Sequence, residues 1–294
     1  MPLWVAISLA SAFMQNLRTA LQKALTPRIG VLGATYARFL FAAPWAVALV
    51  AVLAAREGMP QPTVAFALWG LSGAVAQIVA TLMLLHLFSL RNFAVGNTFA
   101  KTETVQAVLF GLVLLGDRVG AGALAGILVS LVGLVLLSAT RGLAGGVLNR
   151  AAALGLACGA AFALAGIGYR AASLALADTG GLVIRPAFTL AYVTLAQSLL
   201  LTLYLWHRGE GGVRSVLGEW RIEALVGASG MLASLGWFTA FTLATVAQVK
   251  AVGQVELVFS WLTARFAFGE RPSPRETLGI ALVAGGILLL ILAS

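Results

Sequence analysis

The segment ETVQAVLFGLVLLGDR at residues 103–118 begins with an acid, continues as an apolar run and ends in a polar corner; ELVFSWLTARFAFGER at residues 256–271 repeats this plan. A shift of 153 residues places Glu103 on Glu256 and Gly116-Asp117-Arg118 on Gly269-Glu270-Arg271. The same shift aligns flanking positions, namely Phe88, Leu90, Ala94, Gly126 and Gly133 with Phe241, Leu243, Ala247, Gly279 and Gly286. The sequence therefore predicts two copies of one unit, residues 1–141 and 142–294.

Composition indicates that the chain is a membrane protein. Of its 294 residues 61% are hydrophobic and only 10% are charged, and its mean hydropathy is +0.99. A soluble domain cannot bury that much apolar surface, so lipid must be the solvent. The net charge of +9 comes from basic residues spread singly over loop ends, without a nucleic-acid motif. We therefore expect a lipid bilayer and no nucleic acid among the partners.

Ten apolar segments each approach the ~20 residues that a spanning helix needs. They are 3–24, 30–55, 64–87, 92–115, 120–140, 149–172, 181–206, 222–246, 248–268 and 275–293. Five spans per copy is an odd number, so the second copy enters the membrane from the opposite side. The predicted fold class is all-α integral membrane, with ten transmembrane helices as two inverted five-helix repeats.

Loop arginines predict the orientation of these helices. Three, Arg56, Arg118 and Arg170, lie on the side of the termini, and nine lie on the other side. The positive-inside rule places the side with nine in the cytoplasm. Both termini are then expected to face outward, which in a bacterial inner membrane is the periplasmic side.

Glu103 and Glu256 lie deep in their segments. Glu103 is about eleven residues in and Glu256 about eight to ten, or roughly 16 Å and 12–15 Å at 1.5 Å per residue. In a hydrocarbon core ~30 Å thick, both are near the midplane. A charge there costs roughly 3 kcal/mol or more, so an ionised acid needs a partner or water. Two interpretations are open: a transport site between the repeats, or polar pairs that clamp helices together.

Helical spacing limits which polar side chains can share a surface. Lys101 and Glu103 are two residues apart, about 200° around a helix, and cannot pair with each other. Lys250 and Gln254 share one face of their segment, while Glu256 lies on another. We expect one face of each segment to line a cavity and the other to meet a neighbouring helix.

Further candidate site residues lie in other spans. They are Gln15 and Arg18 in the first span, Arg38 in the second, Gln77 and His86 in the third, and Trp237 and Phe241 in the eighth. Arg38 is either a structural partner or a site residue. His86 is either a hydrogen-bonded structural residue or a proton relay. Trp237 either packs or stacks on a ligand.

Motifs of enzymes are absent from the sequence. There is no Walker loop, no Gly-x-Gly-x-x-Gly after a strand and no His-Glu-x-x-His. Two histidines and one cysteine, Cys158, cannot build a convincing metal cluster. We therefore expect no catalysis, no metal and no cofactor, and transport driven by gradients. Gly122-x-x-x-Gly126 and Gly155-x-x-x-Gly159 suit internal packing or dimerisation, so a monomer or weak dimer is expected.

The chain resembles the drug/metabolite transporter superfamily, and in particular its EamA-type exporters, over nearly its whole length. The motifs that carry the resemblance are Leu115-Gly116-Asp117-Arg118, Phe268-Gly269-Glu270-Arg271 and Tyr36-Ala37-Arg38-Phe39. The resemblance implies a central cavity lined by spans one, three, four, six, eight and nine, and export of small metabolites without ATP. Many relatives carry a proline in spans four and nine, where this chain has Lys-Thr-Glu-Thr and Gly-Gln-Val-Glu.

Three functions are considered. The first is a secondary exporter of small polar metabolites, most fittingly amino acids or related zwitterions and anions, because basic residues outnumber acids within the spans. In that case Glu256 contacts a substrate amine or a proton, and Lys101 a carboxylate. The second is an uncoupled facilitator or a flippase of a lipid-linked or amphiphilic substrate. The third is a membrane sensor or scaffold, which leaves the two buried acids without a purpose.

Overall fold

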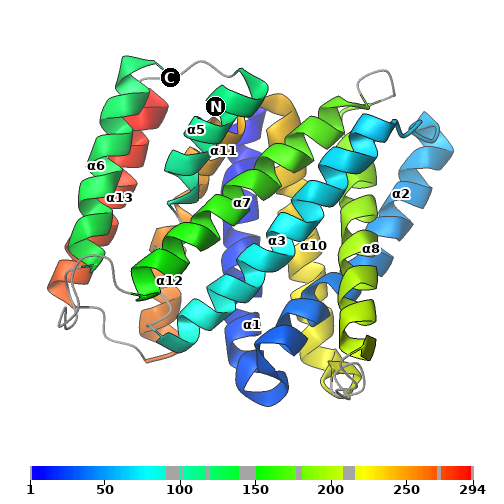
Figure 1. The fold of residues 1–294 in the computed structure, drawn as a ribbon, viewed down its shortest axis with the longest axis horizontal. Coiled ribbons are helices and arrows are strands. Elements are labelled where there is room, and N and C mark those ends of the chain that lie inside the picture. The colour runs from blue at the N-terminus through cyan, green and yellow to red at the C-terminus, as the bar shows by residue number, and fades with distance from the viewer. Residues whose placement is uncertain are drawn as a thin grey trace.

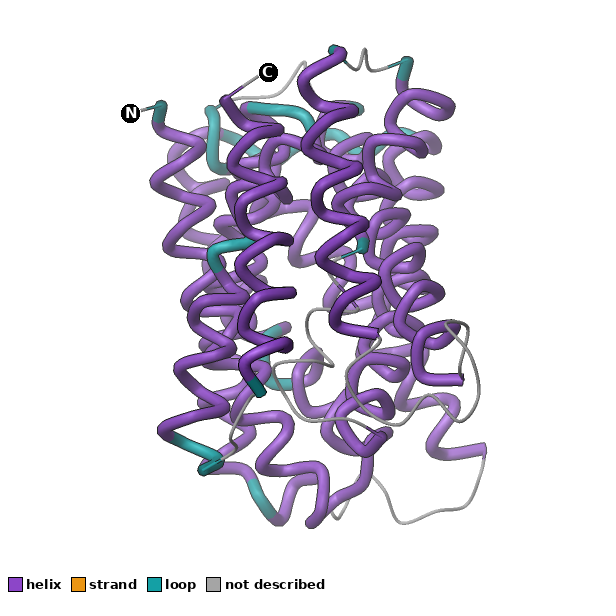
Figure 2. Tube along the Cα trace, turned by 90° about the vertical axis from the view of Figure 1, so that its left-hand side faces the viewer, coloured by secondary structure: helices purple, strands orange, loops and turns teal. Residues whose placement is uncertain are grey.

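The computed structural model describes residues 2–90, 100, 102–116, 120–138, 150–176, 181–207, 216–269 and 273–292, in which every regular element is an α-helix. The helices form one upright bundle, and α1 begins at the same end at which α13 finishes (Figures 1 and 2). Their bounds are α1 Leu3–Leu40, α2 Ala43–Glu57, α3 Val64–Leu90, α5 Glu103–Leu115, α6 Ala121–Ser138, α7 Arg150–Leu174, α8 Ile184–His207, α10 Trp220–Leu243, α11 Val246–Gly253, α12 Glu256–Phe266 and α13 Pro274–Leu292.

The chain is built to cross a membrane. Within the described ranges, five helical stretches are long and apolar enough to span a bilayer: Leu3–Glu57, Val64–Ser89, Ala153–Leu174, Ile184–His207 and Trp220–Leu243. Large apolar side chains such as Val113 (78% exposed) and Phe266 (79% exposed) point away from the bundle. An exterior with many such side chains is typical of a protein surrounded by lipid, because soluble monomers rarely expose large apolar patches. The chain is therefore a multi-pass membrane protein, as its composition predicts.

The helices α1 and α2 do not coincide with the first two predicted spans, 3–24 and 30–55. The backbone of α1 turns sharply at Gly30 (φ 74°, ψ 170°), three residues after Pro27, where the sequence predicts a loop. The predicted span 30–55 is not one helix, because α1 ends at Leu40 and α2 starts at Ala43. Pro44 explains this second break, since it has no N–H to donate and is tolerated only in the first turn of a helix.

The predicted span 248–268 is also two helices, α11 and α12. A capping box between Thr245 and Gln248 starts α11. At the junction, Gln254 and Val255 donate to carbonyls only three residues back, which is the tighter 3₁₀ pattern. Glu256 is consequently the first residue of a short helix, and so is Glu103 in α5 after the turn at Thr102.

The repeat-related corners share one backbone conformation. Gly116 and Gly269 both adopt the left-handed region, with φ of 69° and 63°. Glycine is favoured there because it has no Cβ to clash. The acid and arginine of each corner (117–118 and 270–271), Ala94 and the connection at 141–149 lie outside the described residues.

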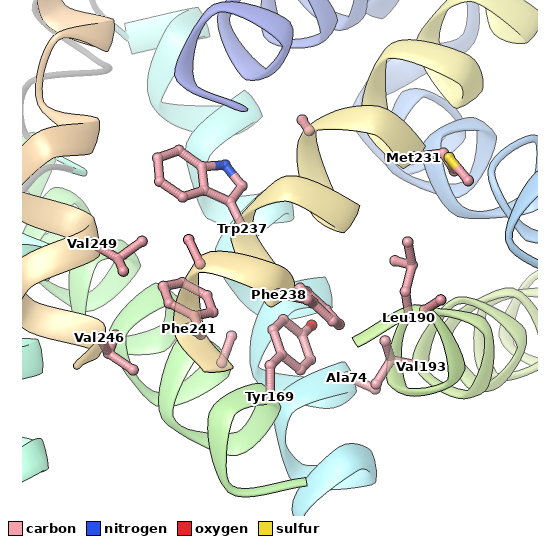
Figure 3. Close-up of a cluster of buried hydrophobic side chains, with 14 of the residues drawn as sticks. Ala74, Tyr169, Leu190, Val193, Met231, Trp237, Phe238, Phe241, Val246 and Val249 are labelled. Carbon is pink, nitrogen blue, oxygen red and sulfur yellow. The ribbon is translucent and has the colours of Figure 1, made fainter. Parts of the chain in front are cut away.

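Helices pair across the two predicted halves. The most extensive contacts join α6 with α13, α3 with α7, and α1 with α10. The first of these pairs stands at the edge of the bundle (Figure 1). Glycines allow the close approach: a Cβ on Gly168 of α7 would lie 3.0 Å from Gly73 Cα of α3. The apolar core gathers between α7, α8, α10 and α11 (Figure 3), with the Tyr169 and Phe238 rings stacked at 4.2 Å.

We predict that Gly227→Ala destabilises the bundle. A Cβ at this position of α10 would lie 2.5 Å from the backbone carbon of Phe41, which a main chain cannot easily evade. Overpacking of this kind costs about 1–3 kcal/mol. The measurement is the temperature at which half of the detergent-purified protein is lost from the monodisperse peak in size-exclusion chromatography. Gly285→Ala on α13 is the control, because a Cβ there meets nothing within 4 Å; an equal loss in both variants would contradict the packing argument.

Candidate functional site

A cavity lies between the helices of the bundle, with about 560 Å³ of empty space when its opening to solvent is included. Helices from both predicted halves line it: α1, α3 and α5 from the first, and α7, α10, α11 and α12 from the second. Nine of the candidate residues border it, namely Gln15, Arg18, Arg38, Gln77, Glu103, Trp237, Phe241, Lys250 and Glu256. Spans one, three, four, six, eight and nine all contribute, as the resemblance implies. Arg38 adds the second span, which was not expected there.

An ion pair between distant parts of the chain stands at the wall of this cavity. Lys250 Nζ donates to Glu103 Oε2 at 2.9 Å, and the two side chains are only 10% and 4% exposed. Three rings surround the ammonium: Trp237, Phe241 and Phe162 have centroids 5.5, 5.8 and 6.0 Å from it. Aromatic faces attract a cation, most strongly when water is excluded. The acid and the rings therefore surround the Lys250 ammonium with groups that attract a cation.

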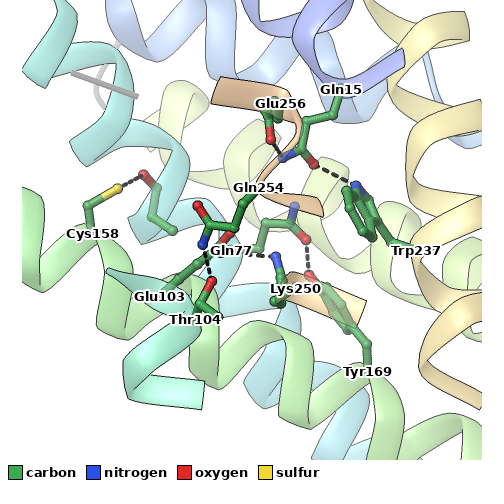
Figure 4. Close-up of polar contacts among 11 residues, drawn as sticks. Gln15, Gln77, Glu103, Thr104, Cys158, Tyr169, Trp237, Lys250, Gln254 and Glu256 are labelled. Carbon is green, nitrogen blue, oxygen red and sulfur yellow. Dashed lines mark hydrogen bonds and ion pairs between the residues drawn. The ribbon is translucent and has the colours of Figure 1, made fainter. Parts of the chain in front are cut away.

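Gln15 connects the second acid to an aromatic wall (Figure 4). Its Nε2 donates to Glu256 Oε2 at 2.8 Å, while its Oε1 accepts from Trp237 Nε1 at 2.8 Å. Both ends of the amide are thus used, which fixes its orientation. The next residue, Asn16, donates to Thr263 Oγ1 at 2.7 Å and accepts from Ser260 at 3.1 Å. α1 is therefore bound to α12 beside the cavity.

Lys250 and Glu256 both reach the same cavity, although their spacing predicts different faces. The reason is the break between α11 and α12, because angular positions extrapolate only along a continuous helix. Gly253 contributes as well: a Cβ there would lie 2.5 Å from the Trp237 ring, so glycine lets the indole pack against the end of α11.

Three candidate residues are not placed at the cavity. Gln254 is buried behind it and donates to Thr104 of α5. His86 is exposed near the end of α3, away from the lining. Lys101 lies outside the described residues, as does Asn97. The carboxylate contact expected of Lys101 therefore stays a prediction.

Tyr169 of α7 lines the cavity and was not among the sequence candidates. Its hydroxyl lies 3.0 Å from the Gly73 carbonyl oxygen, contacts Gln77 Oε1 and accepts from Gln197 Nε2 at 3.2 Å. A tyrosine in an apolar segment carries no charge to mark it, so pattern alone could not single it out. Within the described ranges, no group of three His, Cys, Asp or Glu side chains could hold a metal ion.

Comparisons with known proteins identify the family. Residues 150–292 match the model of the EamA-like transporter family, which places the chain in the drug/metabolite transporter superfamily. A solved structure titled only "Crystal structure of protein" superimposes with a TM-score of 0.70 at 19% identity, covering 99% of this chain and 97% of its own. At that identity the likeness shows a shared fold alone. No curated protein matches the chain.

We predict that Glu103→Gln lowers stability because Lys250 then keeps a buried charge without its acid. Breaking a buried pair in this way costs about 3–5 kcal/mol, whereas replacing both partners by uncharged groups is often tolerated. The double variant Glu103→Gln/Lys250→Met should therefore be more stable than Glu103→Gln alone, as measured by thermal unfolding in detergent. Glu219→Gln breaks the exposed pair with Arg28 and should change little. A double variant weaker than the single one would contradict this account.

Proposed function

We propose that this EamA-type protein is a secondary transporter that exports small polar metabolites. The substrates that fit best are amino acids or related zwitterions and anions. The observation that carries the proposal is the cavity itself, with five charged side chains from both predicted halves on its wall. Small-molecule sites are typically concave and lined mostly by apolar and aromatic side chains with a few convergent polar groups, and this cavity combines the two kinds of lining. The proposal includes no chemical conversion of the solute.

The proposal includes an inverted repeat with halves at 1–141 and 142–294. Three observations support it. The main helix pairs each take one helix from either range. Gly116 and Gly269, equivalent under the shift of 153, share a left-handed backbone. Glu103 and Glu256 each begin a short helix after a break. Discontinuous helices at a site between repeats are a recurring arrangement in secondary transporters.

Alternating access requires contacts that a solute can replace. Lys250–Glu103 and Gln15–Glu256 both border the cavity and both join the two predicted halves. A solute with an ammonium and a carboxylate offers the same groups, so its binding exchanges internal contacts for contacts to the solute. A ligand shifts a conformational equilibrium only through such differential contacts. Rocking of one half against the other around the occupied cavity would then complete transport.

The proposed location is the bacterial inner membrane with both termini on the periplasmic side. The excess of loop arginines on the opposite side supports this orientation. The common end of α1 and α13 supports placing the two termini together (Figure 2).

The test is counterflow of radiolabelled amino acids into proteoliposomes of the purified protein. Saturable exchange of at least one amino acid is expected. Absence of exchange of any solute by well-folded protein would contradict the proposal. Exchange that ignores a pH gradient would instead indicate the uncoupled facilitator.

We predict that Glu256→Gln lowers exchange about 10–100-fold while the protein remains folded. The amide keeps the size of the side chain but removes its charge, and hydrogen bonds to charged groups contribute about 1.5–3 kcal/mol. Glu57→Gln is the matched control, because Glu57 is exposed at the end of α2. Normal exchange by Glu256→Gln would remove Glu256 from the site.

A further inference from the structure

Two arginines of α1 meet at the cavity from either side of its kink at Gly30. Arg18 is 2% exposed and Arg38 is 4% exposed, and both line the cavity. Their stems pass the same glycine of α10: a Cβ on Gly230 would lie 3.2 Å from Arg18 Cδ and 3.8 Å from Arg38 Cγ. On a straight helix the twenty residues from Arg18 to Arg38 would separate them by about 30 Å. The kink therefore brings the two cations together.

Neither guanidinium has all of its N–H donors bonded to acceptors of the protein within the described residues. Arg18 Nη2 donates to Thr19 Oγ1 at 3.0 Å, but Arg18 Nε is buried and has no hydrogen-bond partner. Arg38 Nη1 donates to Thr81 Oγ1 at 2.8 Å, and its guanidinium lies 5.0 Å from the Phe39 ring centroid. No salt bridge joins either arginine to a carboxylate in the described part of the chain. A guanidinium carries five N–H donors, so donors remain for a ligand.

The charges on the described cavity wall do not balance. Three are positive (Arg18, Arg38, Lys250) and two are negative (Glu103, Glu256). Lys250 pairs directly with Glu103, and Glu256 accepts from Gln15. No salt bridge within the described residues neutralises Arg38, whose stem lies with that of Arg18 beside Gly230. A buried charge without a counter-charge is costly, which favours a ligand that supplies one.

A second cavity adjoins the first beside Arg38. It measures about 250 Å³ and shares Arg38, Gln77, Ser234 and Phe238 with the main cavity. Its other lining residues are mostly apolar, including Ala42, Leu190 and Val193. A ligand held at Arg38 can therefore extend an apolar or weakly polar group into this space.

We infer that Arg18 and Arg38 form a carboxylate subsite and that the transported solute is a small organic acid with a net charge of −1. This inference rests on the proposed function, whose site it deepens. Arginine forks fit carboxylate and phosphate alike, but the described part of the wall has one positive charge in excess, which matches a monoanion better than a dianion. A zwitterion would leave that charge uncompensated. Among amino acids, the acidic ones then fit best.

The test compares matched solutes in proteoliposome counterflow. Aspartate is paired with asparagine, glutamate with glutamine, and pyruvate with alanine, so that each pair differs in net charge by one; phosphoserine represents phosphate monoesters. In the wild type, the acid of a transported pair should exchange at least about 10-fold faster than its neutral partner. Arg38→Gln should reduce exchange of the acid about 10–100-fold and exchange of the neutral partner by a smaller factor, so that the preference for the acid falls. Arg28→Gln, at an exposed ion pair, is the control.

Two further variants separate binding from folding. Arg38→Lys keeps the charge but loses the fork, so it should fold and still lose most of the preference for the acid. Gly230→Ala crowds Arg18 and should weaken exchange of the acid several-fold. A wild type that carries both members of each pair equally, or an Arg38→Lys variant with an unchanged preference, would overturn the inference while leaving the transporter proposal standing. Preference for phosphoserine would also overturn it.

If the wild type carries none of these solutes, the proposed function is contradicted only when no other solute exchanges either. The inference is then judged by binding alone. The same acids should raise the thermal unfolding temperature of the purified wild type but not of Arg38→Lys. Equal shifts in both proteins, or none in either, would overturn the subsite.

Discussion

Charges inside an apolar bundle must find partners, and this requirement explains much of the arrangement around the cavity. Lys250 lies between an acid and three aromatic rings supplied by other helices. Glu256 is bound by Gln15, 241 residues away along the chain. Neither contact is possible unless α1, α5, α10 and the α11–α12 pair converge. The charges therefore do more than bind a solute, because they also select one packing of helices whose apolar surfaces alone would permit several.

Breaks in the helices bring these side chains together. A turn at Gly30 sets Arg38 opposite Arg18, and the junction before Glu256 turns it toward the cavity that Lys250 already faces. Short stretches of 3₁₀ pattern and isolated helix breaks often mark hinges. In this protein they lie beside the contacts that join the two predicted halves, so a change at the cavity can act directly on the segments best able to bend.

The sequence predicts much of this architecture because the hydropathy and the shift of 153 residues are properties of long segments. It also identifies Glu103, Glu256, Gln15 and Lys250, since polar groups stand out in an apolar run. It does not predict the pairing of Glu103 with Lys250, which are 147 residues apart. Helical spacing does not predict the position of Gln254, because the helix is broken there. His86 was a candidate because it is polar, but its side chain is exposed and does not line the cavity. Tyr169 is not predicted as a site residue, because its contacts are to residues that α3 and α8 bring next to it.

Alternating access of the cavity is the central claim, and the accessibility of one thiol tests it most directly. Cys158, the one cysteine of the chain, is buried, so Cys158→Ala gives a cysteine-free background. Ser234→Cys then places a thiol on the wall shared by both cavities. A membrane-impermeant maleimide is applied from each side, in cells and in inverted vesicles. The account predicts labelling from both sides, slowed by a transported solute. Labelling from one side alone, indifferent to any solute, would contradict it.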